Sequence, residues 1–287
     1  MASCYTLREG TLVLSDQRLF WRRLSCAAKG RPLLLLHGAG VAGGLTWKGI
    51  VEQLQPRSAI LIPDLRGAGR SESPEGVEVP FSASQVVDDL VALVDQQGFE
   101  QFDVAGYSFG GLMTMLLKER LGDRIMEVTL LEPGLLERAD LEEMRSMRAG
   151  YREAARLIRK TQGKEGIDRF LALIAPHRSR NPRVERIITA RLAERPLGFA
   201  NALDCVTEAI MSLDRAAILE AQQRVLSIVG GNSPYTLRDY HQQLARAQPM
   251  WRTVQLSGTD HSLPFQKPQH VARLIDRAEC RGTGVRY

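Results

Sequence analysis

The chain has 287 residues, of which 44% are hydrophobic and 25% charged, and its formal net charge is +5. This length can bury a large core, and since no uncharged apolar run approaches the ~20 residues of a membrane span, we expect no membrane partner. The positive charge comes without a basic tail or a recognition motif, so we expect no nucleic-acid partner. Four scattered cysteines without a C-x-x-C pair, and a beginning without the apolar stretch of a secretory signal, favour a reduced, cytoplasmic protein.

Strand-like and helix-like segments alternate in the first half of the chain. Residues 5–25 hold short alternating segments typical of an antiparallel edge. Strands buried on both faces are indicated by the apolar runs 32–36, 59–63, 102–106 and 128–133. Helical composition characterises the segments 45–54, 84–97 and 112–121. This order predicts an α/β fold, with a mostly parallel central sheet covered by helices on both faces.

The alternation stops at residue 134 and returns at residue 223. The intervening block, 134–222, is mostly helical in pattern, and strand-like runs reappear at 225–229 and 253–256. We therefore predict a core formed by residues 1–133 and 223–287, with 134–222 inserted as a helical cap. Such a cap would cover the carboxyl ends of the strands, where open α/β sheets place their sites.

Ser108 is the candidate nucleophile. It stands in the pattern G-x-S-x-G, Gly106 to Gly110, between a strand-like run and a helix-like run. Small residues two before and two after the serine allow a strand to turn sharply into a helix. That turn would raise the Ser108 hydroxyl above the end of the sheet, at the positive end of the following helix.

Two further features lie where a serine nucleophile needs them. The turn from His37 to Gly40 follows a central strand and can aim the Ala39 N–H inward, so that Ala39 and Phe109 would form an oxyanion hole. His261 lies in a polar loop after the last strand and could take the Ser108 proton as general base. Other histidines suit this role less well, because one lies in the cap and two lie in helical patterns (His177, His241 and His270).

These motifs together resemble the α/β-hydrolase superfamily, in its serine-nucleophile branch, over nearly the whole chain. The resemblance implies a helical cap, an acyl-enzyme on Ser108, substrate contacts at Gly38 and Tyr107, and neither a metal nor an organic cofactor. It also implies that the loop from Asp64 to Ser71 is structural, with Asp64 and Arg66 as a buried bracing pair. Dehalogenases and epoxide hydrolases of the superfamily carry an aspartate at the elbow, so the serine argues against both.

The acid of the expected triad is the point at which the sequence departs from the family. Its usual position, after the strand 225–229, is occupied by Ser233. The family has a second solution, an acid after the strand that follows the nucleophile helix, and Glu132 stands there as the provisional acid. The alternatives are a histidine oriented by Asn232, an acid from the cap such as Asp204, or no acid. Without an acid, the chain could be a ligand-binding sensor.

An arginine-rich helix in the cap suggests a possible partner. Five arginines recur at spacings of three and four along one stripe (Arg145, Arg148, Arg152, Arg156 and Arg159). The plain interpretation is a solvated charged face. The sharper one is a docking surface for coenzyme A or an acyl carrier protein.

From the motifs around Ser108 and His261 we predict a serine hydrolase of the carboxylesterase class for a small acyl substrate. The alternative is a thioesterase, and lactone or carbon–carbon bond hydrolysis on the same machinery stays open.

Overall fold

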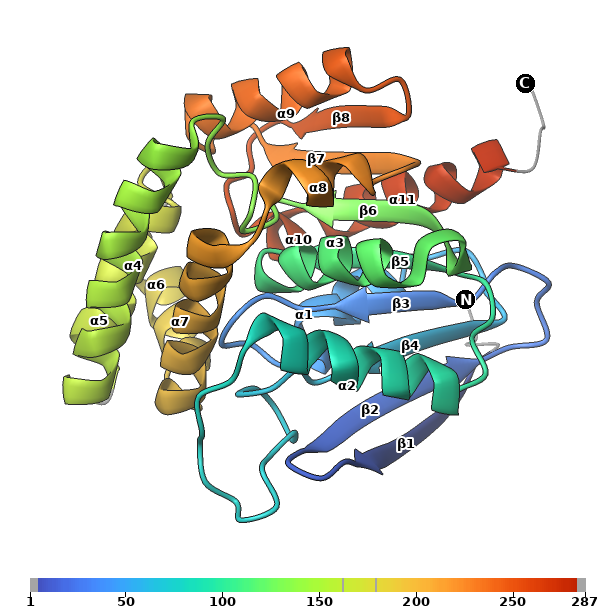
Figure 1. Cartoon of the computed structure of the whole chain (residues 1–287), viewed down its shortest axis with the longest axis horizontal. Coiled ribbons are helices and arrows are strands. Elements are labelled where there is room, and N and C mark those ends of the chain that lie inside the picture. Colours follow the sequence, from blue (N-terminus) through green and yellow to red (C-terminus); the bar gives the residue numbers. More distant parts are fainter. Residues whose placement is uncertain (1–4, 162, 179, 283–287) are drawn as a thin grey trace.

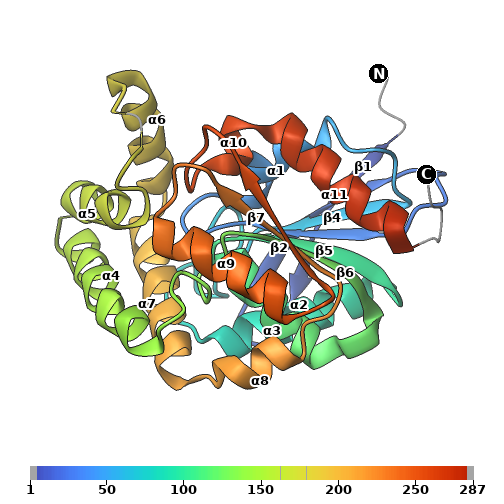
Figure 2. The ribbon, with the colours of Figure 1, turned by 90° about the horizontal axis from the view of Figure 1, so that it is seen from above.

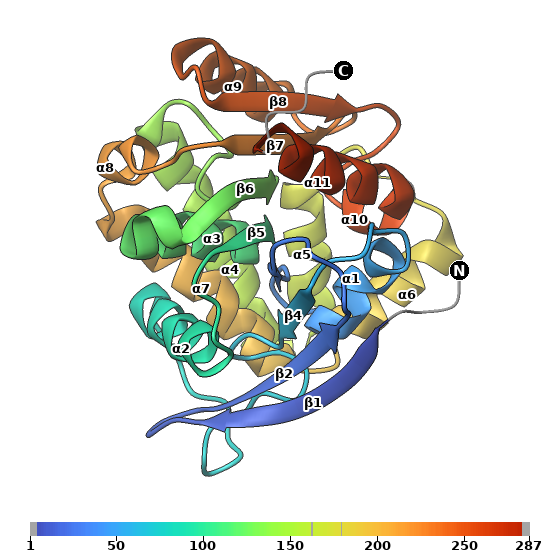
Figure 3. The same cartoon turned by 90° about the vertical axis from the view of Figure 1, so that its right-hand side faces the viewer.

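The computed structural model describes residues 5–161, 163–178 and 180–282, and a central eight-stranded sheet organises them. The strand order is β1-β2-β4-β3-β5-β6-β7-β8. At one edge, β1 (Thr6–Val13) and β2 (Arg18–Ser25) form an antiparallel hairpin, and β2 pairs antiparallel with β4. The other strands run parallel: β3 (Leu33–Leu36), β4 (Ala59–Pro63), β5 (Phe102–Tyr107), β6 (Ile125–Leu131), β7 (Val225–Gly230) and β8 (Trp251–Leu256). The predicted mostly parallel sheet is confirmed, and Figure 3 shows its twist between β1 and β8.

Helices cover both faces of this sheet (Figures 1 and 2). One face carries α1 (Gly43–Val51), α10 (Leu263–Gln266) and α11 (Pro268–Gly282). The other carries α2 (Ala83–Gln96), α3 (Phe109–Leu121) with the short η1 (Gly122–Arg124) after it, and α9 (Tyr235–Ala247). In β3, Leu33 and Leu35 pack in one buried cluster while Leu34 and Leu36 pack in the other. Since successive side chains of a strand point to opposite faces, the continuous apolar run follows from burial on both sides.

The inserted block forms a cap of helices at the end of the sheet to which the parallel strands point (Figure 1). It contains α4 (Leu141–Thr161), α5 (Lys164–Ile174), α6 (Pro182–Leu192) and α7 (Pro196–Ser212). The last inserted helix, α8 (Arg215–Glu220), returns to the core, and Gln222 after it donates to the Met115 carbonyl of α3 at 3.1 Å. Within the described ranges, no helix is long and apolar enough to cross a membrane.

Close backbone packing fixes the cap on the core. A Cβ placed on Gly198 at the start of α7 would lie 2.2 Å from the Gly67 carbonyl oxygen, so that only glycine fits there. Beside this contact, Arg195 pairs with Glu78 at 2.6 Å and donates to the carbonyl of Ser71 at 2.5 Å. The loop after β4 and the start of α7 are therefore held together by close backbone packing, an ion pair and a hydrogen bond.

The arginines of the α4 stripe are all paired with acids. Each of the five arginines has a carboxylate partner: Arg145 pairs with Glu142, Arg148 with Glu137, Arg152 with Glu208, Arg156 with Glu153 and Arg159 with Asp204. Arg148 is moreover buried, and it also donates to the Gly134 carbonyl at 2.7 Å. Two of these acids, Glu142 and Glu153, lie on α4 itself, and the other three come from segments that helical spacing does not reveal. The sequence pattern therefore overstated the charge available to a polyanionic carrier.

Two buried carboxyls, Asp103 and Glu127, lie on the neighbouring strands β5 and β6. Asp103 accepts from Arg57 at 2.6 Å and from Arg31 at 2.9 Å. Glu127, on the neighbouring β6, is also buried, and its ion pair with Arg224 is long, at 3.9 Å. Burial, helped by the nearby Asp103 charge, raises the pKa of Glu127 to about 7.

Replacing Glu127 by glutamine should stabilise the protein at high pH. Between its ordinary pKa of 4.5 and its folded value of about 7, the folded carboxyl keeps a proton that the unfolded chain has released. Stability from this group therefore falls as pH rises through that window. With solvent screening taken into account, the ionised Glu127 lowers the free energy of unfolding above pH 7 by about 1–2 kcal/mol, which corresponds to about 2–6 °C in Tm. Thermal unfolding at pH 5 and pH 8 measures it.

The expected result is that Glu127→Gln gains in Tm at pH 8 relative to the native chain, with a clearly smaller gain at pH 5. Glu119→Gln is the matched control, because Glu119 is exposed on α3 and loses the same charge. An equal change at both pH values, or the same pH dependence in the control, would contradict the assignment.

Candidate active site

The backbone at Ser108 is strained, and the positions two before and two after it have room for glycine only. Ser108 has φ 52° and ψ −110°, between the end of β5 and the start of α3. A Cβ on Gly106 would lie 2.2 Å from Thr114 Oγ1, and one on Gly110 would lie 2.3 Å from the Leu36 carbonyl oxygen. The strand and helix therefore approach each other so closely that both flanking positions require glycine.

Hydrogen bonds to neighbouring strand ends hold this turn. The Ser108 N–H donates to the Leu131 carbonyl at 3.0 Å, and the Ser108 carbonyl accepts from Gly134 N–H at 3.1 Å. Gly110 N–H donates to the His37 carbonyl at 2.9 Å, which ties the turn to the loop after β3. A left-handed serine persists only when its surroundings fix it in this way, and such strain is typical of functional sites.

The expected oxyanion donors, Ala39 and Phe109, belong to the two segments that meet at Ser108, the loop after β3 and the start of α3. Phe109 is the first residue of α3, where backbone N–H groups have no partner inside the helix. Ala39 lines the same pocket as Ser108. Among the residues that the structure describes, neither of these two amides donates a hydrogen bond, so both are available to a bound oxygen.

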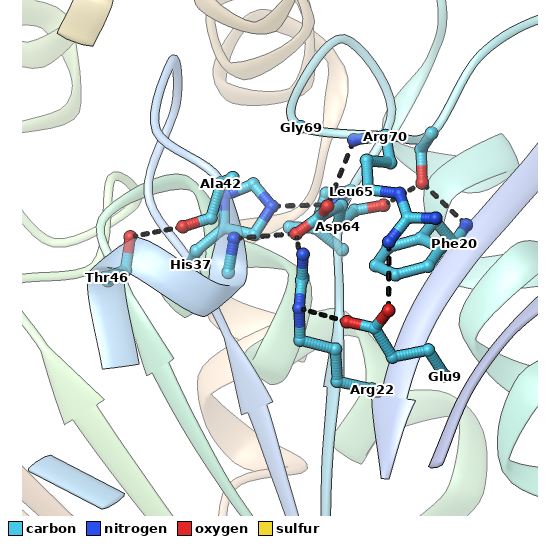
Figure 4. Close-up of polar contacts among 12 residues, drawn as sticks. Glu9, Phe20, Arg22, His37, Ala42, Thr46, Asp64, Leu65, Gly69 and Arg70 are labelled. Carbon is cyan, nitrogen blue, oxygen red and sulfur yellow. Dashed lines mark hydrogen bonds and ion pairs between the residues drawn. The ribbon is translucent and has the colours of Figure 1, made fainter. Parts of the chain in front are cut away.

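His37 braces the loop after β3 (Figure 4). Its Nε2 accepts from the Leu65 N–H at 2.7 Å, so its Nδ1 carries the proton and donates to the Gly38 carbonyl at 2.7 Å. Burial lowers the pKa of His37, and the nearby Asp64 does not restore it to its ordinary value. A neutral, fully engaged ring holds the Gly38–Ala39 backbone in place.

The expected Asp64–Arg66 pair is wrong, although both side chains are buried. Asp64 accepts from Gly43 N–H at 2.9 Å, from Arg70 N–H at 3.0 Å and from the Arg22 guanidinium at 3.1 Å (Figure 4). Arg66 instead forms two-pronged pairs with Asp89 on α2 and with Asp16 in the β1–β2 turn. The two residues point to different partners, and the loop is braced through both.

Glu132 lies against His261, in the geometry that a triad acid would need. Its Oε2 accepts from His261 Nδ1 at 2.8 Å, and its carboxyl is 1% exposed. Two more donors reach its Oε1, the Gly230 N–H at 2.6 Å and the Ser233 hydroxyl at 2.5 Å. Burial alone would raise the pKa of Glu132, but His261, Ser233 and Gly230 together hold it below its ordinary value.

Two of the alternative orienters lie elsewhere. Asp204 pairs with Arg159 on the outer side of the cap at 2.7 Å, and Asn232 is exposed in the loop after β7. Ser233, at the position where the family would carry its acid, donates to Glu132 instead. The same corner of the fold thus contains a carboxylate that comes from β6 and a hydroxyl that comes from the loop after β7.

The His261 ring is held by an aromatic neighbour. Tyr107, the last residue of β5, lies with its ring 5.1 Å from the imidazole, and Phe265 of α10 packs edge-on at 6.4 Å from Tyr107. A Cβ on Gly38 would lie 2.8 Å from the Tyr107 ring, so the loop after β3 lies directly on it. Burial, with Glu132 and Asp260 nearby, raises the pKa of Tyr107, so its hydroxyl stays neutral.

One pocket of about 350 Å³ brings these groups together between the core and the cap. Five of the expected site residues line it: Gly38, Ala39, Tyr107, Ser108 and His261. The cap contributes residues of α5, of α6 and of the loop between them, which are mainly aliphatic and aromatic but include two arginines, Arg178 and Arg191. Phe109 and Glu132 are buried and are not among the residues that line the pocket. In the described ranges, no group of histidine, cysteine and acidic side chains has the arrangement of a metal site.

Sequence reasoning missed the supporting donors of this site. Ser233 stood out in the sequence only because it replaces the usual acid. Nothing in the neighbouring residues indicates its hydrogen bond to Glu132, which lies 101 positions earlier. Nor does the sequence indicate that the Gly230 N–H donates to Glu132, or that Arg191 lines the pocket. Of the cysteines, Cys205 is a buried free thiol, and Cys4 lies outside the described residues.

Comparison with known proteins agrees with this geometry. Residues 31–268 match the family model described as alpha/beta hydrolase fold. A curated relative, a 2-hydroxymuconate semialdehyde hydrolase of Pseudomonas sp. strain CF600, is 31% identical over 104 residues, 36% of each chain. The match thus spans about a third of that relative's length.

Two solved structures share the architecture over nearly their whole length. A thermophilic esterase from Thermogutta terrifontis has a TM-score of 0.74 at 21% identity, covering 97% of this chain and 100% of its own. The enol-lactonase from Burkholderia xenovorans LB400 has a TM-score of 0.70 at 22% identity, covering 94% and 99%. The family match over most of the chain and the strained serine turn agree, and this chain belongs to the α/β hydrolase fold family.

Proposed function

We propose that this chain is a serine hydrolase that cleaves an ester-like bond of a small acyl substrate through an acyl-enzyme at Ser108. The observation that carries the proposal is the Glu132–His261 hydrogen bond at the pocket that Ser108 lines. A buried acid on Nδ1 fixes the tautomer in which Nε2 is free to accept a proton. A purely structural histidine in that loop would not need a buried carboxylate on its Nδ1.

The proposed reaction follows from these positions. His261 Nε2 takes the Ser108 proton as Oγ attacks the substrate carbonyl, and the Ala39 and Phe109 N–H groups stabilise the tetrahedral oxyanion. The resulting imidazolium is stabilised by the ionised Glu132. His261 then gives its proton to the leaving group, and a water molecule activated in the same way releases the acid and free Ser108.

The substrate is proposed to be small and largely apolar. A cavity of about 350 Å³ is near the lower end of the roughly 300–1,000 Å³ of small-molecule sites. The relatives named above are a hydrolase of 2-hydroxymuconate semialdehyde, an esterase and an enol-lactonase. An activated acyl ester is the simplest probe of the shared chemistry.

The two alternative functions have less support. A thioesterase for coenzyme A or an acyl carrier protein would use a free cationic surface, and the arginines of α4 are paired with acids. A non-hydrolytic sensor was considered because the usual acid is absent. Glu132 supplies a carboxylate on His261, which favours turnover over binding alone.

Labelling with a serine-reactive fluorophosphonate tests the nucleophile. The native chain should gain the mass of one adduct, and Ser108→Ala should gain none, because only an activated hydroxyl attacks the phosphorus. Ser262→Ala is the matched control, since Ser262 lines the same pocket. Intact-mass spectrometry reads the result. A folded native chain that stays unlabelled, or a labelled Ser108→Ala chain, would refute the proposal.

Substitution of the acid and its donor should give graded losses. Glu132→Gln should lower kcat for an activated ester by about 10³–10⁴, because the tautomer is no longer enforced. Ser233→Ala removes one charge-assisted hydrogen bond and should lower kcat about tenfold. KM should stay nearly constant in both, and circular dichroism checks the fold. A Glu132→Gln chain with more than a tenth of native kcat would exclude Glu132 as the acid.

A further inference from the structure

We propose that Arg191 binds a carboxylate at the far end of the substrate, so that the preferred acyl group carries a negative charge. This inference rests on the proposed function and adds the substrate class to it. It follows from the one wall of the pocket that the hydrolytic machinery does not use.

Arg191 occupies an apolar position of a cap helix. On α6, Val184, Ile187 and Ile188 line the pocket, and Arg191 follows at the next helical repeat and lines it too. Residues spaced by three, four and seven share one face of a helix, so Arg191 lies on the same face as these aliphatic side chains. A guanidinium at this position brings charge to a wall that is otherwise apolar.

That charge has no acidic partner in the part of the chain that the structure describes. The other pocket arginine, Arg178, forms a two-pronged pair with Glu185, at 2.8 and 3.4 Å. The one carboxyl of the lining, Asp260, accepts from Ser262 N–H at 2.8 Å and Gln266 at 3.0 Å. No described carboxylate forms an ion pair with Arg191, which makes it the uncompensated cation of the pocket.

A series of ring contacts links this cation to His261 along the pocket. The Arg191 guanidinium lies 5.9 Å from the centre of the Phe265 ring. Phe265 packs on Tyr107, and Tyr107 packs on His261. The guanidinium can therefore face a ligand whose carbonyl lies at Ser108 and whose chain extends along the apolar wall.

A carboxylate is the chemistry that this arrangement fits best. A guanidinium presents two parallel N–H donors that match the two oxygens of a carboxylate, and the aliphatic side chains beside it, Val184, Ile187 and Ile188, offer no competing polar group. Among the described residues of the lining, the second arginine, Arg178, is already paired with Glu185, and the guanidinium of Arg191 suffices to bind one carboxylate. The pocket volume suits a short aliphatic chain between the two ends.

Two esters of equal chain length test the inference. The 4-nitrophenyl monoester of glutaric acid ends in a carboxylate, and 4-nitrophenyl pentanoate ends in a methyl group. Arg191→Met should lower kcat/KM for the glutarate ester about 10- to 100-fold, mainly through KM, and change the pentanoate value less than threefold. Arg191→Lys should keep part of the preference. Arg186→Met, which removes an exposed charge from the same helix, should change neither.

An equal loss with both esters, or no loss with either, would overturn the proposal. If the native chain hydrolyses neither ester, thermal-shift titration with glutaramate and with pentanamide still decides it. Stabilisation by glutaramate that disappears in Arg191→Met supports the anion site independently of turnover. If fluorophosphonate labelling fails but glutaramate still binds, the proposed serine hydrolase would be refuted and the proposed carboxylate site at Arg191 would stand.

Discussion

The hydrogen bond between Glu132 and His261 connects the two halves of the core. Glu132 follows β6 and His261 follows β8, on opposite sides of the inserted cap in the sequence. Ser233, after β7, completes the contact from the strand between them. Because three adjacent parallel strands end at the same edge, one buried carboxylate can collect a ring N–H, a hydroxyl and a backbone N–H. Its charge is stabilised by these donors in an environment that would otherwise disfavour it.

Backbone strain at two neighbouring strand ends accompanies this arrangement. Ser108 after β5 has φ 52° and Glu132 after β6 has φ 43°, both in the left-handed region that favours glycine. The Ser108 N–H bonds the last carbonyl of β6, and the Gly134 N–H bonds the Ser108 carbonyl. The parallel register of β5 and β6 therefore sets the positions of the serine and the acid together. Conformational cost at these residues is offset by hydrogen bonds and by packing in the two cores.

Much of the fold could be predicted because burial on both faces leaves a strong signature. The run from Leu33 to Leu36 is apolar at every position, and its strand supplies both cores. The serine turn was predictable because sterics at Gly106 and Gly110 restrict the residue types. Boundaries were less accurate: the helix expected from 112 begins at Phe109, and the strand expected to reach 133 ends at Leu131, where Glu132 turns left-handed.

Pairings between distant segments could not be predicted, because local patterns do not specify partners. Asp64 and Arg66 stand two residues apart, yet they bond different elements. Arg152 and Arg159 of α4 find acids on α7, which cancels the charge that helical spacing indicated. The acid stayed open between Glu132 and other candidates for the same reason. Arg191 shows the reverse case, an ordinary charged residue of a helix that tertiary packing brings to a pocket.

The tautomer of His261 tests the central claim most directly. Nitrogen-15 NMR of histidine-labelled protein near neutral pH, assigned with a His261→Gln variant, reports which ring nitrogen carries the proton. The account predicts a strongly hydrogen-bonded Nδ1–H on His261 in the native chain, and its loss or weakening in Glu132→Gln. A native His261 with its proton on Nε2, or an Nδ1–H signal unchanged by Glu132→Gln, would contradict Glu132 as the group that orients the proposed base.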